Sequence, residues 1–156
     1  MRPARTPIGL YLTHASRAIS RAFDDALADA GGSLPVWLVL LNLKMRAVAN
    51  QRELAEAMGI REATLTHHLN AMEAAGLITR RRDPANRRIH VVELTEAGEL
   101  SFGQLRRAAV AFDAQLRRDV TDDEIVALER LLGRLAANVA LPDGRLPWAG
   151  FAEDRS

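Results

Sequence analysis

Two short helix-forming segments that meet at Gly59, followed by an arginine-rich hairpin, constrain the fold of this chain most. Asn50 and Glu53 have the spacing of a capping box, which predicts a helix of about nine residues ending at Gly59. A second helix is predicted for residues 61–75, with Gly76 as its stop. The order of helix, tight turn, helix and hairpin indicates a winged helix-turn-helix.

Residues 79–88, TRRRDPANRR, hold five of the chain's 21 lysine and arginine residues. They lie between the apolar or β-branched runs 77–79 and 89–94, and the Asp-Pro-Ala-Asn sequence at their centre favours a turn. We therefore expect a β-hairpin with a long, arginine-rich tip. The formal net charge of the chain is only +1, so any attraction to a polyanion must come from such a local cluster.

The predicted helix at 61–75 has one apolar side and one small, polar side. Leu65, Leu69 and Met72 recur at helical spacing and define its buried side. The opposite face carries Ala63, Thr66, His67, Asn70 and Ala74, with Thr64 and Ala71 on its flank. Threonine, histidine and asparagine can donate hydrogen bonds to base edges or phosphates, and a DNA major groove admits one α-helix. The sequence therefore predicts that this helix reads double-stranded DNA while the basic hairpin lies along the adjacent minor groove.

Four further helices flank this region, which gives a mainly α fold with six helices and a small β-hairpin wing. A first helix is predicted for residues 6–30, and a second, apolar on nearly every side and so buried all round, for residues 34–45. A fifth is predicted for residues 95–118 and a sixth for 121–139. The fifth helix is longer than one small domain needs for its own core, which suggests that it has a partner.

The composition of the chain excludes several classes of function. Only seven residues are aromatic, which counts against the stacking platforms of proteins that bind RNA or single strands. The chain has no cysteine and no pattern typical of a phosphate loop or a catalytic serine, so we expect no enzyme and no cofactor. We expect no metal site, because the neighbouring His67 and His68 point about 100° apart on a helix. His68 lies nearer the buried side of the helix and is expected to pack against the protein. The absence of a long apolar run and of a secretory signal predicts a cytoplasmic protein with no membrane partner.

The segment from Asn50 to Gly98 resembles the winged helix-turn-helix core of the MarR family of bacterial transcription regulators. The resemblance rests on the motifs G-L-I-x-R, D-P-x-x-R-R and L-T-x-x-G, which follow Leu69 in the family's order and spacing. The flanking helices also match the family's layout, so the resemblance covers about residues 6–140.

This resemblance implies a homodimer, built by the first, fifth and sixth helices of both chains. It implies a repressor that binds a palindromic operator in double-stranded DNA and is released by a small-molecule effector.

Trp148 and Phe151 lie in the C-terminal tail, residues 141–156. Three interpretations of this tail stay open: a strap that packs on its own chain, disorder, or a contact with a second subunit. The expected divisions are N-terminal dimerisation and core helices (1–45), a DNA-binding core (46–98), C-terminal dimerisation helices (99–140) and the irregular tail (141–156).

Residue by residue, the resemblance places Thr64 and His67 at the major groove and Arg87 at the wing tip, where it enters the minor groove. His67 stands where the family usually has arginine and Asn86 where it usually has aspartate, which leaves Asp83 as the acid able to orient a wing arginine. The complete set of expected DNA-binding residues is Thr64, Thr66, His67, Asn70, Arg80, Arg82, Arg87 and Arg88.

Other interpretations stay open. His14, Arg17 and Trp37 lie where the resembled family often forms its ligand pocket, but packing or a surface position is the simpler account of each. His90 is expected to face solvent from the second strand of the hairpin. The alternative function is a winged-helix interaction module whose arginine tip binds an acidic protein partner.

Overall fold

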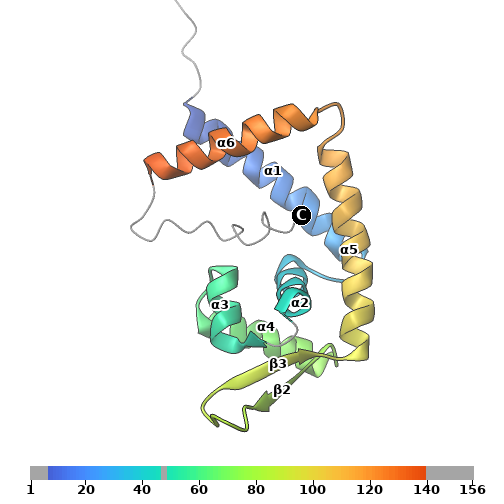
Figure 1. Cartoon of the computed structure of the whole chain (residues 1–156). Coiled ribbons are helices and arrows are strands. Elements are labelled where there is room, and N and C mark those ends of the chain that lie inside the picture. Colours follow the sequence, from blue (N-terminus) through green and yellow to red (C-terminus); the bar gives the residue numbers. More distant parts are fainter. Residues whose placement is uncertain (1–6, 47–48, 140–156) are drawn as a thin grey trace, which may run out of the picture.

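The computed structural model describes residues 7–46 and 49–139, which form six helices and a three-stranded sheet (Figure 1). The elements in chain order are α1 (Ile8–Asp29), α2 (Leu34–Arg46), β1 (Ala49–Asn50), α3 (Gln51–Met58), α4 (Glu62–Ala74), β2 (Ile78–Arg82), β3 (His90–Leu94), α5 (Glu96–Leu116) and α6 (Asp122–Asn138). The prediction of a mainly α fold with a small β-hairpin wing is confirmed. The predicted tail, with Trp148 and Phe151, lies outside the described residues.

Helix α2 lies at the centre of the core, as its apolar sequence predicts, but it is not buried all round, because Met45 in its last turn is 49% exposed. Its Val39, Leu40 and Leu43 are buried, and the helix packs against α1, α3, α5 and β3. The buried amide of Asn42 donates from Nδ2 to the carbonyl oxygen of Leu38 at 2.8 Å, which satisfies the donor inside the core. Each fully buried leucine or valine contributes about 1.5–3 kcal/mol, so α2 holds the helix-turn-helix firmly against α1 and α5.

By length and apolar composition, no single helix in the described ranges could cross a membrane. Helix α1 and residues 34–45 of α2 pass that test only when they are taken together, as a pair bent by 76°.

The predicted helix-turn-helix is present as α3 and α4. Asn50 Oδ1 accepts a hydrogen bond from the Glu53 backbone N–H at 2.8 Å, and the Glu53 carboxylate accepts one from the Asn50 N–H at 3.4 Å, which confirms the capping box. Gly59 follows α3 with φ +64°, and Gly76 lies just beyond α4 with φ +73°. Glycine adopts this left-handed conformation without a Cβ clash, so the two glycines fix where the helices end.

The first strand of the hairpin is longer than predicted, since the sequence suggested that it ends at residue 79. Strand β2 continues to Arg82, which pairs with His90 of β3, so the arginines at 80–82 are strand residues. The tip is therefore confined to residues 83–89, and of the five arginines only Arg87 and Arg88 lie in it. Strand β1 was not predicted: it is two residues long, too short to show a period, and it pairs with the other edge of β3.

Helices α1, α5 and α6 extend away from the wing. Figure 1 shows α5 running from the end of β3 to α6 at the opposite end of the molecule. Helix α1 packs along α5, where the rings of Phe23 and Phe112 have their centroids 5.0 Å apart. Helix α6 begins at the predicted capping box of Thr121 and Glu124, yet it contains no buried residue. Its apolar face is therefore left uncovered by the described part of its own chain.

Candidate nucleic-acid interface

Helix α4 presents the polar face that its sequence predicts. Leu65 and Leu69 are fully buried and hold the helix on the core, whereas Thr64, His67 and Asn70 are exposed. The other exposed positions in the middle of this face are alanines, and its two acidic residues lie near the ends of the helix. A convex helix with short, uncharged side chains can approach the floor of a DNA major groove closely.

Thr66 is only partly exposed, because its hydroxyl has two partners inside the protein. Thr66 Oγ1 donates to the carbonyl oxygen of Glu62 at 2.8 Å and accepts a hydrogen bond from Gln51 Nε2 at 2.5 Å. A hydroxyl has one proton, so Thr66 keeps no donor for DNA and has only acceptor capacity left. Gln51, at the first turn of α3, was not singled out from the sequence, since no periodic pattern connects it to α4.

Arg80, expected to contact phosphate, is bound to α4 instead. Its Nε and Nη2 donate to Glu73 Oε2 at 3.0 and 2.6 Å, and Nη2 also donates to Asn70 Oδ1 at 2.6 Å. The Arg80 side chain is only 19% exposed. The hydrogen bond from Arg80 lowers the pKa of Glu73 from its ordinary value, since it stabilises the ionised carboxylate.

Arg81 points to the other face of the hairpin, where it pairs with Glu93 of β3. The guanidinium makes two hydrogen bonds of 3.0 and 2.9 Å to the two carboxylate oxygens. These hydrogen bonds lower the pKa of Glu93 and raise that of Arg81. Two of the five arginines that look like one cluster in the sequence are therefore neutralised by carboxylates of the same chain.

The remaining wing arginines are Arg82, Arg87 and Arg88. All three are exposed, and within the described residues none of them forms an ion pair. Arg82 lies at the end of β2 opposite His90, which is exposed as predicted. Within the wing, the positive charge available to a polyanion is thus concentrated at the distal end of the hairpin.

The tip is organised by side chains that accept backbone hydrogen bonds. Asp83 Oδ1 accepts from the N–H groups of Ala85 at 2.7 Å and Asn86 at 3.4 Å, so it shapes the turn and does not pair with a wing arginine as the sequence suggested. Asn86 Oδ1 accepts from the N–H of Arg88 at 3.2 Å. The amide oxygen of Asn86 thus accepts this hydrogen bond at the position where the resembled family usually has aspartate.

The three residues expected near a ligand pocket are in different environments. His14 and Arg17 are exposed on α1, whereas Trp37 is buried in α2. The Trp37 ring stacks on Phe102 with the centroids 5.6 Å apart, which is a packing role. None of these three side chains lines the pocket that the described residues form behind the wing.

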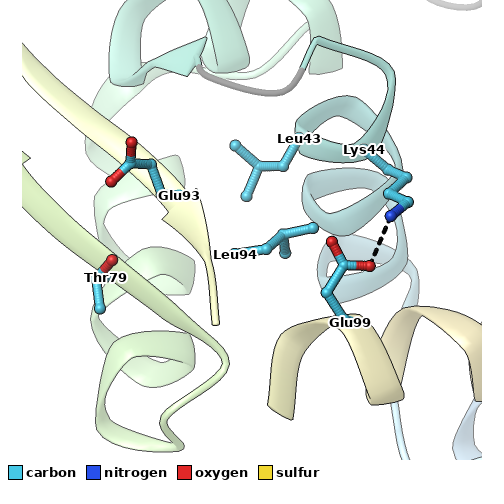
Figure 2. Close-up of a pocket in the computed structure, with 6 residues that line it drawn as sticks. All are labelled: Leu43, Lys44, Thr79, Glu93, Leu94 and Glu99. Carbon is cyan, nitrogen blue, oxygen red and sulfur yellow. Dashed lines mark hydrogen bonds and ion pairs between the residues drawn. The ribbon is translucent and has the colours of Figure 1, made fainter. Parts of the chain in front are cut away.

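That cavity, of about 410 Å³, lies behind the wing, between α2, the hairpin and the start of α5 (Figure 2). Figure 2 shows Thr79 and Glu93 on its strand side, Lys44 and Glu99 on its helix side, and two leucines between them. Lys44 Nζ donates to Glu99 Oε2 at 2.7 Å, and Glu93 is held by Arg81. The charged groups of this cavity therefore already have partners. Its lining comes from four elements, which is why no local sequence pattern indicated it.

Comparisons with known proteins agree with this geometry. Residues 33–90 match the family model "MarR family". Among solved structures, CouR bound to a 23-mer DNA duplex is 27% identical, with 83% of this chain and 92% of that chain covered and a TM-score of 0.76. A mutant of MarR from E. coli, complexed with operator DNA, is 22% identical, with 83% and 93% covered and a TM-score of 0.76. CouR from Rhodococcus jostii RHA1, bound to p-coumaroyl-CoA, is 23% identical, with 87% and 96% covered and a TM-score of 0.73. The predicted winged helix-turn-helix fold and the predicted resemblance are confirmed.

Proposed function

We propose that this chain, a DNA-binding transcriptional regulator of the MarR family, acts as a homodimeric repressor that binds a palindromic operator in double-stranded DNA. The observation that carries the proposal is the exposed polar face of α4 beside three wing arginines that form no ion pair within the described residues. The place of action is then the cytoplasm, where the protein meets the chromosome.

In this proposal the exposed residues of α4 read base edges in the major groove. Thr64, His67 and Asn70 supply the donors, while Thr66 offers only an acceptor. Arg87 enters the minor groove at the wing tip, and Arg82 and Arg88 contact phosphates beside it. Arg80 and Asp83 are reassigned to holding the wing in shape, because their side chains are engaged within the protein.

Dimerisation is supported by the uncovered apolar face of α6. Leu128, Leu131 and Leu132 are exposed on this helix, and Tyr11 is exposed on α1. A twofold axis through these helices would present the two copies of α4 to successive major grooves, about 34 Å apart, which is why the operator is proposed to be palindromic. Residues 1–45 and 99–140 would then carry the dimer and residues 46–98 the DNA contacts.

Release by a small-molecule effector is the remaining part of the proposal. CouR, a protein of the same fold, holds p-coumaroyl-CoA. We place the effector of this chain near α1 and α2, where His14, Arg17 and Trp37 lie. The DNA-binding region joins the outer helices there, so a bound molecule could change the spacing of the two α4 helices.

The test is titration of the purified chain into the DNA upstream of its own gene, followed by fluorescence anisotropy at several salt concentrations. The three wing arginines that form no ion pair within the described residues give six in a dimer, so log affinity should fall with log salt with a slope of about −5. Arg87→Ala should flatten the slope by about 2 and weaken binding. Arg81→Ala removes the same charge from an ion-paired position, so it should leave the slope unchanged.

A flat salt response of the wild-type protein would contradict the proposal. Equal effects of the two substitutions would also contradict it, because the wing tip would then contribute only net charge. If the wild type and Arg87→Ala both bound the upstream DNA no better than unrelated duplex, and Arg87→Ala abolished capture of an acidic protein, the interaction-module alternative would replace the proposal.

A further inference from the structure

We propose that Arg80 is a positioning residue that fixes the amide of Asn70 as a hydrogen-bond donor, so that α4 selects guanine at the base pair that Asn70 meets. The inference rests on the proposed function and deepens it by naming a base preference. It follows from one shared contact between the recognition helix and the wing.

The contact joins three side chains from two elements. Arg80 Nη2 lies 2.6 Å from Asn70 Oδ1 and 2.6 Å from Glu73 Oε2, and Arg80 Nε lies 3.0 Å from the same Glu73 oxygen. Glu73 therefore holds the guanidinium in place, and the guanidinium holds the amide. Charge-assisted hydrogen bonds of this length are among the stronger ones in proteins, so Asn70 is ordered before DNA arrives.

The orientation of the Asn70 amide follows from donor and acceptor chemistry. A guanidinium has only donors, so the amide atom that faces Arg80 must be the oxygen. A flipped amide would set its NH₂ group against the guanidinium and lose the bond. Asn70 is exposed on the polar face of α4, so its NH₂ group is the part left to meet a base.

This arrangement disfavours the usual reading of adenine by asparagine. That reading needs the amide to donate to N7 and accept from N6–H at the same time. In this chain the Asn70 oxygen already accepts from a cation, which makes it a poorer acceptor for a base and makes the NH₂ group a better donor. Guanine offers two acceptors, N7 and O6, in the major groove, and so suits a side chain that presents donors.

The same contact argues against Arg80 as a phosphate ligand. Its side chain is mostly covered and its charge is compensated by Glu73. Arg80 is therefore expected to change which base is bound, while Arg82, Arg87 and Arg88 change how strongly any duplex is bound.

The experiment measures the base preference of four proteins on a library in which each operator position carries all four bases. The wild type should prefer guanine about tenfold over adenine at one symmetry-related pair of positions, and Asn70→Ala should abolish that preference and so locate the pair. Arg80→Met keeps the length of the side chain but removes its donors. It should shift the preference at this pair towards adenine by about tenfold, with the salt slope of the wild type retained. Arg81→Met makes the same chemical change one residue away and should alter no base preference.

A uniform loss of affinity in Arg80→Met, with a salt slope flatter by about 2 for the dimer, would overturn the inference, because Arg80 would then be a phosphate ligand. An unchanged guanine preference in Arg80→Met would overturn the inference and leave the proposed function intact. So would a wild type that prefers particular bases at other positions but has no guanine preference at the pair that Asn70 meets. Absence of any sequence preference in the wild type would overturn both. If thermal melting shows that Arg80→Met does not fold, Asn70→Asp keeps the acceptor for Arg80 but removes the NH₂ donor; it should lose the guanine preference, and a retained preference would overturn the inference.

Discussion

Gln51 Nε2 donates a hydrogen bond of 2.5 Å to Thr66 Oγ1, which ties the first turn of α3 to the middle of α4. The same hydroxyl donates to Glu62 O at 2.8 Å, so its proton has a fixed direction. Together these bonds set how the two helices of the helix-turn-helix lie against each other. The hydrogen bond between Gln51 and Thr66 therefore helps to hold the exposed face of α4 in its orientation, and it lies beside that face.

Removal of this hydroxyl should destabilise the protein. Thr66→Val keeps the shape of the side chain but leaves the partly buried Gln51 amide without its acceptor, which should cost about 1 kcal/mol in chemical denaturation. Thr64→Val makes the same change at an exposed neighbouring position and should alter stability by less than about 0.5 kcal/mol. Equal effects at the two positions would show that the contact with Gln51 contributes nothing.

Acid should weaken the wing through Glu93. The hydrogen bonds from Arg81 hold its pKa below the ordinary value of 4.5, so the folded state binds this proton less readily than the unfolded state. The contribution of the pair is therefore complete above pH 4.5 and is lost as the pH falls through the lower folded pKa. Melting curves between pH 6 and 3 should show Tm falling in the wild type and falling less in Glu93→Gln.

The control for this acid effect is Glu129→Gln, which removes an exposed carboxylate that makes no ion pair within the described residues. It should follow the wild-type curve. Parallel curves for Glu93→Gln and the wild type would mean that the pair does not stabilise the folded wing.

A charge placed on the apolar face of α6 should prevent the proposed dimer from forming. Leu131 is 48% exposed in the single chain, and Leu131→Glu would bury a carboxylate in the proposed dimer interface. Sedimentation should then show a monomer, and affinity for a palindromic site should fall by at least a hundredfold, because two half-sites no longer bind together. Arg130→Glu introduces the same side chain one position away and should remain dimeric. A dimeric Leu131→Glu protein would place the interface elsewhere.

Gly98 should not tolerate a side chain. A Cβ at this position would lie 2.1 Å from the carbonyl oxygen of Leu77, so the start of α5 would have to move away from the base of β2. Gly98→Ala should therefore cost about 3 kcal/mol in the free energy of unfolding. Gly103→Ala lies on the same helix, where the nearest atom is the end of the flexible Arg107 side chain at 3.9 Å, and it should stabilise the protein by up to about 1 kcal/mol.

The helices and their ends could be predicted from the sequence because the signals for them are local. A capping box such as Asn50 with Glu53, or a glycine such as Gly59, acts within one turn of the helix that it ends. The buried side of α4 was also predictable, since Leu65 and Leu69 are four residues apart on a regular helix. The end of β2 was placed too early, because the sequence around Arg80 carries no apolar alternation.

The partners of the arginines could not be predicted in this way. Arg80 reaches Asn70 and Glu73 only after the wing folds back on α4, and Arg81 meets Glu93 only in the register that the hairpin adopts. The sequence therefore overestimated the free positive charge of the wing, and the structure reduces it from five arginines to three.

The sequence alone determined which segments are helical, where they stop and which of their faces are apolar, because those properties depend on residues within a few positions of one another. Only the tertiary structure decided which of the charged and polar side chains stay available to a nucleic acid. That outcome depends on strand register and on the packing of α4 against the wing, which join residues that no short-range pattern connects.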